Sequence, residues 1–284
     1  MTEPASSYQL LCDIFDTLPA DLFIHCILPH VARDWLFVSS YWHPLAFRNL
    51  LSDPRVDPAA RDNVAIQCAT DQGHTKLVEL LLADPRVDPA ANMNKAIQVA
   101  ATCGYVRIFE LLLAHTRVNP AANVNNAIRL AAMYGHVKVV ELLLADPRVD
   151  PADRNNVAIQ HAAERGHVKV VELLLADRRV SPCADRNFAF QAAAQHGHAK
   201  IVELLLADPR VNPADKHNIA IRFAAESGHD KVVALLLADS RVNPTVANNI
   251  AIRRAAVNGH GEVVALLLAD TRVDSTNVDH YAMR

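Results

Sequence analysis

The chain has 284 residues, of which 51% are hydrophobic, 21% charged and 5% aromatic, and its formal net charge is −3. These proportions are typical of a soluble protein whose core is built from aliphatic side chains. No run of residues approaches the roughly 20 apolar positions of a membrane-spanning helix. The near-neutral charge, without a long basic block, argues against nucleic acid as the main partner.

The cysteines and the first residues of the chain bear on the cellular compartment. The five cysteines are odd in number, widely spaced and never in a CxxC pair, which favours reduced thiols. They are Cys12, Cys26, Cys68, Cys103 and Cys183. The amino-terminal tail, residues 1–16, has no basic segment leading into an apolar one, as a signal peptide would. We therefore expect a cytoplasmic or nuclear protein.

Residues 18–47 read LPADLFIHCILPHVARDWLFVSSYWHPLAF and differ from the text that follows them. They resemble the F-box, whose pattern runs L-P-x-E-L-x-x-x-I-L-x-x-L and then V-S-x-x-W-x-x-L. The matching residues are Leu18, Pro19, Asp21, Leu22, Ile27, Leu28, Val31, Val38, Ser39, Trp42 and Leu45. F-boxes are small helical modules that insert apolar side chains into the linker subunit of a cullin–RING ubiquitin ligase. The resemblance implies such a module at residues 17–52, with a ligase-binding set of Leu18, Pro19, Leu22, Ile27 and Leu28.

The same segment departs from the F-box pattern in its middle. About four residues are missing between Ile27-Leu28 and Val38-Ser39, and Pro29 interrupts the text there. The alternative is a helical cap that shields the first repeat of the array described next, since the ends of such arrays need covering. In register with that array, Leu45–Asp53 falls on the second helix of a repeat, with Leu50-Leu51 on Leu81-Leu82.

From residue 53 onward the chain repeats itself every 31 residues, which is the mark of a solenoid. Arg-Val pairs keep this interval eight times, from Arg55-Val56 to Arg272-Val273. Glycine keeps it at Gly73, Gly104, Gly135, Gly166, Gly197, Gly228 and Gly259. Asparagine keeps it at Asn63, Asn94, Asn125, Asn156, Asn187, Asn218 and Asn249.

The unit at residues 156–182 shows how one repeat is built. Its first part, NVAIQHAAERG, has apolar residues at helical spacing, with Asn156 at the N-cap position and Gly166 at the end. Its second part, HVKVVELLLAD, is too apolar to face water on both sides, and most units end it with a pair such as Asp146-Pro147. Each unit therefore reads as helix, turn, helix and a short extended connection. Because one unit cannot bury a core alone, its packing residues must fit the next unit.

The recurring string N-x-A-I-x-x-A-A-x-x-G-H-x-x-V-V-E-L-L-L resembles the ankyrin repeat, T-P-L-H-x-A-A-x-x-G-H-x-x-V-V-x-L-L-L. The resemblance covers residues 53–274 and implies an all-α, ankyrin-type helix-turn-helix solenoid of seven repeats. The short helical F-box-like module would stack on it, and a truncated eighth repeat would follow at 275–284. The period of 31 rather than 33, and the missing glycine of the family's hairpin, predict a shorter connection, down to a single turn.

The recurring polar residues have structural interpretations. In ankyrin proteins a histidine after the repeat glycine bonds backbone groups between repeats, and six histidines stand there. They are His74, His136, His167, His198, His229 and His260, with Tyr105 in the remaining repeat. The asparagines act either as simple N-caps or as a ladder across units. The pairs Lys76/Glu79, Lys138/Glu141, Lys169/Glu172 and Lys200/Glu203 indicate a solvated face of the second helix.

The two positions before each glycine vary from repeat to repeat. In the ankyrin family they end the first helix and line the groove that holds partner proteins, which makes them the candidate target-binding residues here. Free drift at exposed positions is the alternative. Met133 and Tyr134 are the best candidates for an apolar anchor. The set is Asp71, Gln72, Thr102, Cys103, Met133, Tyr134, Glu164, Arg165, Gln195, His196, Glu226, Ser227, Val257 and Asn258.

No catalytic motif stands out. The chain has no G-x-S-x-G elbow, P-loop or G-x-G-x-x-G, and His196-Gly197-His198 falls in ordinary repeat positions without a completing metal-ligand set. We expect no enzyme activity, no cofactor, no metal, and a monomer. The first hypothesis is a substrate receptor of an F-box type cullin–RING ligase, which binds the cullin linker and an unknown target protein. The alternative is an ankyrin binding scaffold whose amino-terminal helices are only a cap.

Overall fold

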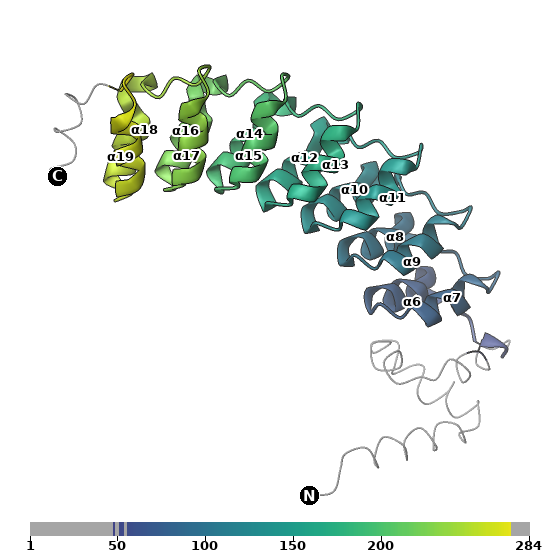
Figure 1. Ribbon diagram of the computed structural model, residues 1–284. Helices are drawn as coiled ribbons and strands as arrows, with labels where there is room; N and C mark the ends of the chain where they lie inside the picture. The colour runs from purple at the N-terminus through teal and green to yellow at the C-terminus, as the bar shows by residue number, and fades with distance from the viewer. Residues whose placement is uncertain (1–47, 49–50, 54–55, 274–284) are drawn as a thin grey trace, which may run out of the picture. The chain divides into compact units, whose positions relative to one another are not determined.

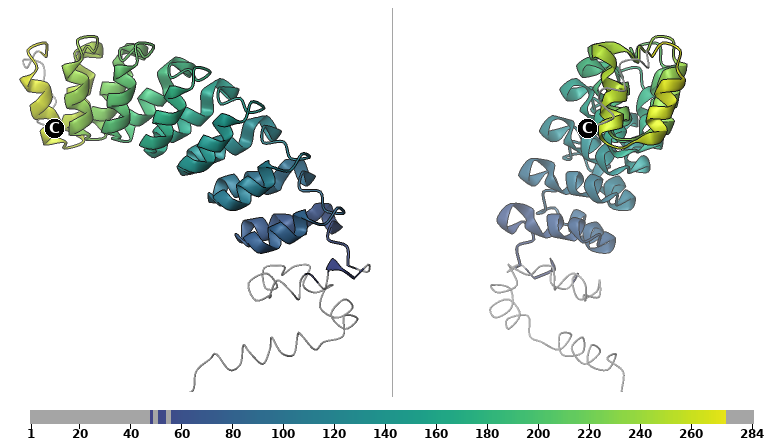
Figure 2. Two further views of the ribbon diagram at one scale, coloured as in Figure 1. Left: turned by 45° about the vertical axis from the view of Figure 1, so that its right-hand side comes forward. Right: turned by 90° about the vertical axis from the view of Figure 1, so that its left-hand side faces the viewer.

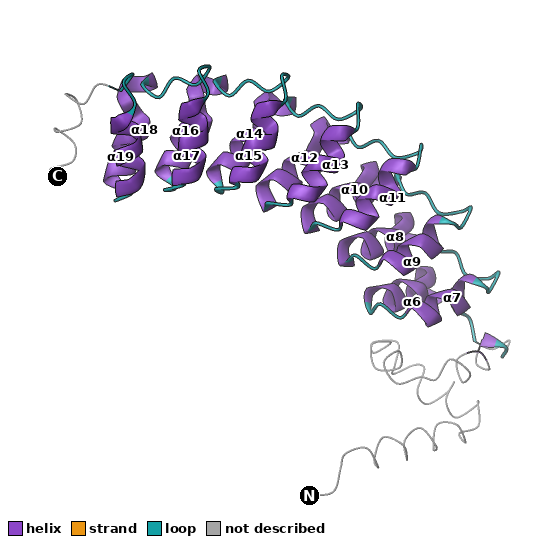
Figure 3. Cartoon of the chain, in the orientation of Figure 1, coloured by secondary structure: helices purple, strands orange, loops and turns teal. Residues whose placement is uncertain are grey.

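The computed structural model describes residues 48, 51–53 and 56–273, and this part of the chain contains fourteen α-helices and no strand (Figures 1 and 3). The helices alternate between a first and a second helix of each repeat, which confirms the all-α helix-turn-helix prediction. The first helices are α6 (Ala60–Asp71), α8 (Ala91–Cys103), α10 (Ala122–Tyr134), α12 (Asp153–Arg165), α14 (Ala184–Gln195), α16 (Asp215–Glu226) and α18 (Val246–Val257). The second helices are α7 (Thr75–Leu82), α9 (Val106–Leu113), α11 (Val137–Ala145), α13 (Val168–Ala176), α15 (Ala199–Ala207), α17 (Asp230–Ala238) and α19 (Gly261–Ala269).

The chain divides into two compact units, Met1–Asn123 and Val124–Arg284. In the first unit α6 packs against α7 and α8, and α9 packs against α7 and α8. In the second unit the first helices α12, α14, α16 and α18 pack in chain order, and the second helices α11, α13, α15, α17 and α19 do the same (Figure 2). Within each unit, these helices therefore pack on their neighbours in the chain.

The core of each repeat follows from its small and branched apolar residues. In α12 the buried side chains are Ala158, Ile159, Ala162 and Ala163, and in α13 they are Val170, Val171 and Leu174. Alanines let the first helices of neighbouring repeats approach closely, while the aliphatic residues of the second helix fill the space between pairs. The same seven positions are apolar and buried in the five middle repeats, whereas Thr70 is polar in the first repeat and Leu77, Ala256 and Val264 are partly exposed in the first and last repeats.

The repeat glycines end the first helices as predicted. All seven have φ between 72° and 80°, a left-handed backbone that costs glycine little. After Gly166, the His167 N–H donates to the Ala162 carbonyl at 2.9 Å, and the chain turns directly into α13.

The opening of each first helix decides between the two roles predicted for the asparagines, N-cap and ladder. Asn156 has a φ of 64° and a ψ of 38°, a left-handed backbone unlike that of an N-cap, and so do Arg154 and Asn155. Every first helix begins with such a turn of three left-handed residues, which we call the repeat-opening turn. These turns are residues 61–63, 92–94, 123–125, 154–156, 185–187, 216–218 and 247–249.

The reason for the left-handed backbone of Asn156 lies in the next repeat. The Asn156 side-chain oxygen accepts a hydrogen bond from the backbone N–H of Ser181, at 2.7 Å, rather than from its own helix. Left-handed backbone costs most residues about 1–2 kcal/mol each. Asparagine tolerates it better than most residues, and here its buried amide is used across the repeats.

The connections between repeats are turns, as the shortened period predicts. After α11, Asp146 adopts an extended backbone, its carboxylate accepts the N–H of Arg148 at 2.9 Å, and its carbonyl accepts the N–H of Val149 at 3.1 Å. No strand occurs in the described ranges, so the hairpin of longer ankyrin repeats is replaced by a single turn.

Most of the F-box-like segment lies outside the described residues, including Leu18, Pro19, Leu22, Ile27 and Leu28. Its end is described at Leu51, whose carbonyl accepts a hydrogen bond from Arg86 at 2.8 Å. Leu144 has the same relation to Arg179, at 3.1 Å. Leu51 therefore occupies the position of a residue at the end of a second helix, in agreement with the register expected for Leu45–Asp53.

Candidate functional site

Within each unit, two sets of side chains link one repeat to the next and thereby position the surface between them. The first set is the asparagine ladder. Six asparagine side-chain oxygens accept the backbone N–H of the residue 25 positions later, in the following connection. The acceptors are Asn63, Asn94, Asn125, Asn156, Asn187 and Asn218, at 2.7 to 3.3 Å. Of the two predicted roles, the structure thus selects the ladder.

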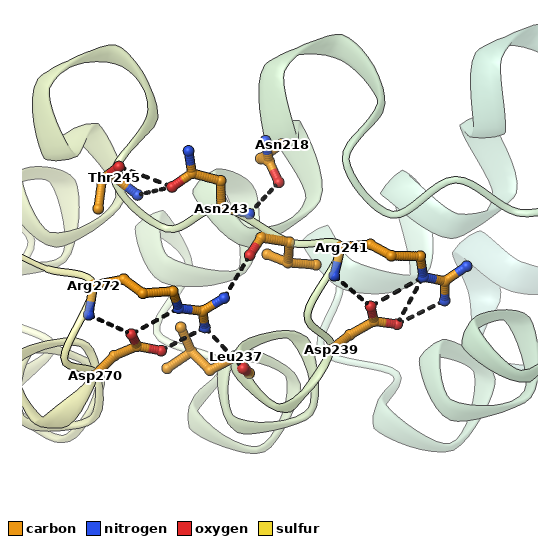
Figure 4. A network of polar contacts seen from close by, with 9 residues as sticks. Asn218, Leu237, Asp239, Arg241, Asn243, Thr245, Asp270 and Arg272 are labelled. Carbon is orange, nitrogen blue, oxygen red and sulfur yellow. Dashed lines mark hydrogen bonds and ion pairs between the residues drawn. The ribbon is translucent and has the colours of Figure 1, made fainter.

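The second set, the arginine of each Arg-Val pair, was not predicted to have a role. Arg272 forms a bidentate pair with Asp270 and donates to the carbonyls of Val242 and Leu237, at 2.8 and 2.9 Å, in the preceding repeat (Figure 4). The same bond to a Val carbonyl 30 residues earlier is made by Arg86, Arg117, Arg179, Arg210, Arg241 and Arg272. The recurring D-x-R-V spacing was the signal that could have revealed this set.

The aspartates of these pairs are held in their charged form. The arginine hydrogen bond lowers the pKa of each carboxyl, against the opposing effect of burial. This applies to Asp84, Asp146, Asp177, Asp208, Asp239 and Asp270. Since each pair orients a guanidinium toward the previous repeat, the ion pair is part of the repeat junction rather than a separate surface feature.

Bonds between repeats are made by four histidines that follow repeat glycines, in the way that the ankyrin resemblance implied. The Nε2–H of His167 donates to the Met133 carbonyl at 2.9 Å, and its ring lies against Gly135 of the preceding repeat. Equivalent bonds are made by His198 to Glu164, by His229 to Gln195 and by His260 to Glu226, each at 2.9 Å. The carbonyls that accept these bonds belong to the first of the two variable positions.

The fourteen candidate target-binding residues, which we call the variable edge, all reach the surface in their own unit. Tyr134 is 49% exposed and Val257 is 74% exposed, while residues such as Met133 and Glu164 are half-buried. The histidine bonds hold the backbone carbonyls at the first of the two variable positions, and the side chains take no part in these bonds. The structure places these residues on the surface, and their role in binding stays a prediction.

Some variable-edge residues also contact one another or the next repeat. Glu226 forms an ion pair with Arg254, and its carbonyl accepts the Asn258 side-chain N–H at 2.7 Å. The Tyr134 ring stacks near that of His136, with ring centroids 6.3 Å apart. The edge therefore changes from apolar and aromatic at α10 to charged at α16.

The repeat-opening turns form a second variable surface, which the sequence interpretation missed. Their first two residues differ in every repeat and all but one are exposed, and Met93 is 69% exposed. In four repeats a glutamine five residues later donates its side-chain amide to the carbonyl of the middle turn residue. The glutamines are Gln67, Gln98, Gln160 and Gln191. The variability of the two residues before each repeating Asn was the available signal.

The predicted second-helix ion pairs are confirmed. Lys76–Glu79, Lys138–Glu141, Lys169–Glu172 and Lys200–Glu203 have N–O distances of 2.6 to 3.0 Å. They lie at the surface and contribute little to stability at such positions.

No group of three or more histidine, cysteine, aspartate or glutamate side chains in the described ranges could hold a metal ion. None of the described helices is both long and apolar enough to span a membrane. Cys68, Cys103 and Cys183 are free thiols, and burial raises the pKa of the Cys68 and Cys103 thiols, which lowers their reactivity.

Comparison with known proteins agrees with the stacked helix pairs. A family model of ankyrin repeats (3 copies) matches residues 64–155, 128–215 and 190–279. These matches span well over half of the sequence, so the chain belongs to the ankyrin-repeat family. A crystal structure of an ankyrin repeat domain from Acinetobacter baumannii AYE is 22% identical, with a TM-score of 0.47, and the match covers 61% of this chain and 96% of that chain. Comparison with curated proteins finds no match.

Proposed function

We propose that this chain binds a partner protein through its variable edge and performs no catalysis of its own. The observation that carries the proposal is that backbone and side chain have different roles at these positions. The backbone carbonyls of Met133, Glu164 and Gln195 are held by histidines of the next repeat, while the side chains differ in each repeat and reach the surface. A rigid backbone with varied side chains is suited to specific recognition, since little order has to be gained on binding.

Met133 and Tyr134 form the proposed anchor of this surface. They are adjacent at the end of α10, and large, partly apolar side chains supply most of the binding free energy in protein interfaces. Ankyrin repeats are a common scaffold for protein–protein interaction, which supports the same assignment. A cytoplasmic or nuclear location, and a monomeric state without partner, remain part of the proposal.

The test is a comparison of captured partners by proximity labelling with three forms of the full chain. Wild type is compared with Met133→Ala/Tyr134→Ala and with Lys200→Ala/Glu203→Ala, a surface pair on the second helix α15. We expect the first double variant to lose specific partners while its thermal unfolding is unchanged, and the second to keep them. Equal loss in both variants, or no loss in the first, would contradict the proposal.

We further propose that the partner is a target for ubiquitin transfer, with residues 17–52 acting as an F-box. The pattern LPADL followed by VSSYW supports this proposal, which is independent of the array. Catalysis would then belong to the other ligase subunits, and this chain would supply proximity. Co-purification with the cullin linker, and its loss in Leu18→Ala/Pro19→Ala, is the expected result. Absence of co-purification would leave a binding scaffold whose amino-terminal helices are only a cap.

A further inference from the structure

The repeat-opening turns are joined to one another by a frame of side chains that is complete between α14 and α16. Gln191 donates its amide to the Arg186 carbonyl, and its oxygen accepts Lys216 Nζ at 3.3 Å. Asp215 accepts two further bonds, from Asn187 Nδ2 and from the Lys216 backbone N–H, both at 2.9 Å. The cation that begins the α16 turn therefore has a neutral acceptor in the preceding repeat.

Between α10 and α12 the same frame is present with one change. Asp153 again accepts two bonds, from Asn125 Nδ2 and from the Arg154 backbone N–H, both at 2.7 Å. Arg129, however, stands in the position of Gln191. An arginine has no acceptor, so this position offers Arg154, which corresponds to Lys216, no amide oxygen, and the charges of Arg129 and Arg154 oppose each other.

The Arg129 side chain is only partly satisfied by its surroundings. Its Nη2 donates to the Asn126 side-chain oxygen at 2.6 Å, but its buried Nε has no hydrogen-bond partner in the described part of the chain. Burial lowers the pKa of Arg129, and Arg154 lowers it further, against the opposing effect of Asp153. The Nε of Arg222, at the same position three repeats later, also has no partner, so this lack comes with arginine at the position. A buried donor without a partner costs about 1–3 kcal/mol, so arginine here lowers stability relative to glutamine.

We propose that Arg129 and Arg154 bind a carboxylate from an acidic segment of the partner protein. This inference rests on the proposed function and specifies the chemistry of its partner. Arg129 and Arg154 carry two positive charges and Asp153 one negative charge, so one carboxylate neutralises the cluster. A guanidinium pairs with a carboxylate through two parallel hydrogen bonds, which is a charge-assisted and directional contact.

The location of the pair agrees with this assignment. Arg129 and Met133 lie four residues apart on α10, on the same face of the helix, roughly 5–6 Å apart at Cβ. A partner segment with an acidic residue beside an apolar one would engage both. A nucleic-acid strand fits less well, because its binding needs several cations along the strand, and the charges of Asp185 and Arg186 in the next turn cancel.

The experiment measures the binding of a fluorescein-labelled hexaglutamate peptide to the full chain by anisotropy at about 50 mM salt. Hexaglutamine is the control for charge, and a hexathymidylate strand tests nucleic acid. Two reciprocal variants exchange the frames: Arg129→Gln makes the α10–α12 frame like that of α14–α16, and Gln191→Arg does the reverse. Thermal unfolding of each variant is followed in parallel.

We expect wild type to bind hexaglutamate and not hexaglutamine, Arg129→Gln to weaken this binding about fivefold, and Gln191→Arg to strengthen it. The thermal midpoint of Arg129→Gln should be equal to or above that of wild type, and that of Gln191→Arg should be lower. A structural role for Arg129 predicts the opposite stability change in Arg129→Gln, and this result would overturn the proposal.

Three other outcomes would also overturn it: no hexaglutamate binding by wild type, unchanged binding by Arg129→Gln, or tighter binding of hexathymidylate than of hexaglutamate. These outcomes leave the variable edge untouched, because the Met133→Ala/Tyr134→Ala comparison uses protein partners and does not depend on Arg129. A loss of partners in that double variant together with a failure of hexaglutamate binding would retain protein binding and reject the acidic segment.

Discussion

The connections and the variable edge both contact the neighbouring repeat, yet only the connections keep the same residues. In a connection, side chains make the contact: Arg179 donates to carbonyls of the previous repeat, and Asn156 accepts the N–H of Ser181. At the variable edge, the Glu164 backbone carbonyl makes the contact, with His198. Arg179, Asn156 and His198 thus recur together with the side-chain bonds that they make, whereas Glu164, which contributes only its backbone carbonyl to the His198 bond, can be replaced in other repeats.

The variable edge was therefore found in the sequence by its variation within the repeat register. Residues that bond the neighbouring repeat are repeated along the connections and differ from repeat to repeat at the variable edge. The variable edge is thus free to differ in each repeat without loss of the stack. Its freedom is a consequence of how the carbonyls are held, and it is what a recognition surface requires.

The largest effect is expected for Gly135→Ala, which breaks the junction at the backbone. Gly135 has a φ of 76°, and a Cβ there would lie 2.6 Å from His167 Nδ1. We expect a loss of about 2–3 kcal/mol in the free energy of unfolding, from backbone strain and from displacement of the histidine. Urea unfolding measures it.

Two further glycines separate the causes of that loss. Gly259 has a φ of 75° with nothing within 4 Å of an added Cβ, so Gly259→Ala should show the backbone strain alone. Gly261 begins α19 without positive φ and with open space, so Gly261→Ala should have no cost. Equal losses for Gly135→Ala and Gly259→Ala would show that the His167 contact contributes nothing to the loss in free energy of unfolding.

A smaller effect is expected for Arg179→Ala, which breaks the junction at a side chain. Arg179 donates to Val149 and Leu144 carbonyls, at 2.9 and 3.1 Å, and pairs with Asp177. We expect a loss of about 1–2 kcal/mol, because the bonds are charge-assisted but partly exposed to solvent. The neighbouring, exposed Arg178 is the control, and Arg178→Ala should stay within about 0.5 kcal/mol of wild type.

Much of the fold could be predicted from the sequence, because the residues that repeat every 31 positions have conformational preferences that act within one repeat. Glycine at a helix end, aliphatic residues at helical spacing and Lys–Glu pairs three apart each specify geometry within one repeat. The ankyrin resemblance added the histidine bonds. The surface position of the variable edge followed from the same register.

The features that could not be predicted are those determined by contacts with the neighbouring repeat. Asn156 is an equally good N-cap or ladder residue by its type, and only the N–H of Ser181 decides between them. The left-handed backbone of Arg154 and Asn155 has no local signal such as glycine. Arg129 is one more polar residue on a helix until Gln191 shows which bonds that position makes elsewhere.

The most direct test of these inter-repeat contacts is amide hydrogen exchange at Ser181 in Asn156→Ala, compared with Asn155→Ala. Both substitutions put alanine on a left-handed backbone, with φ of 64° and 59°, but only the Asn156 side chain accepts the Ser181 N–H. We predict exchange at Ser181 about tenfold faster in Asn156→Ala than in Asn155→Ala, which corresponds to a lost bond of about 1–1.5 kcal/mol. Equal exchange in the two variants would contradict the claim that the recurring residues recur because they bond the next repeat.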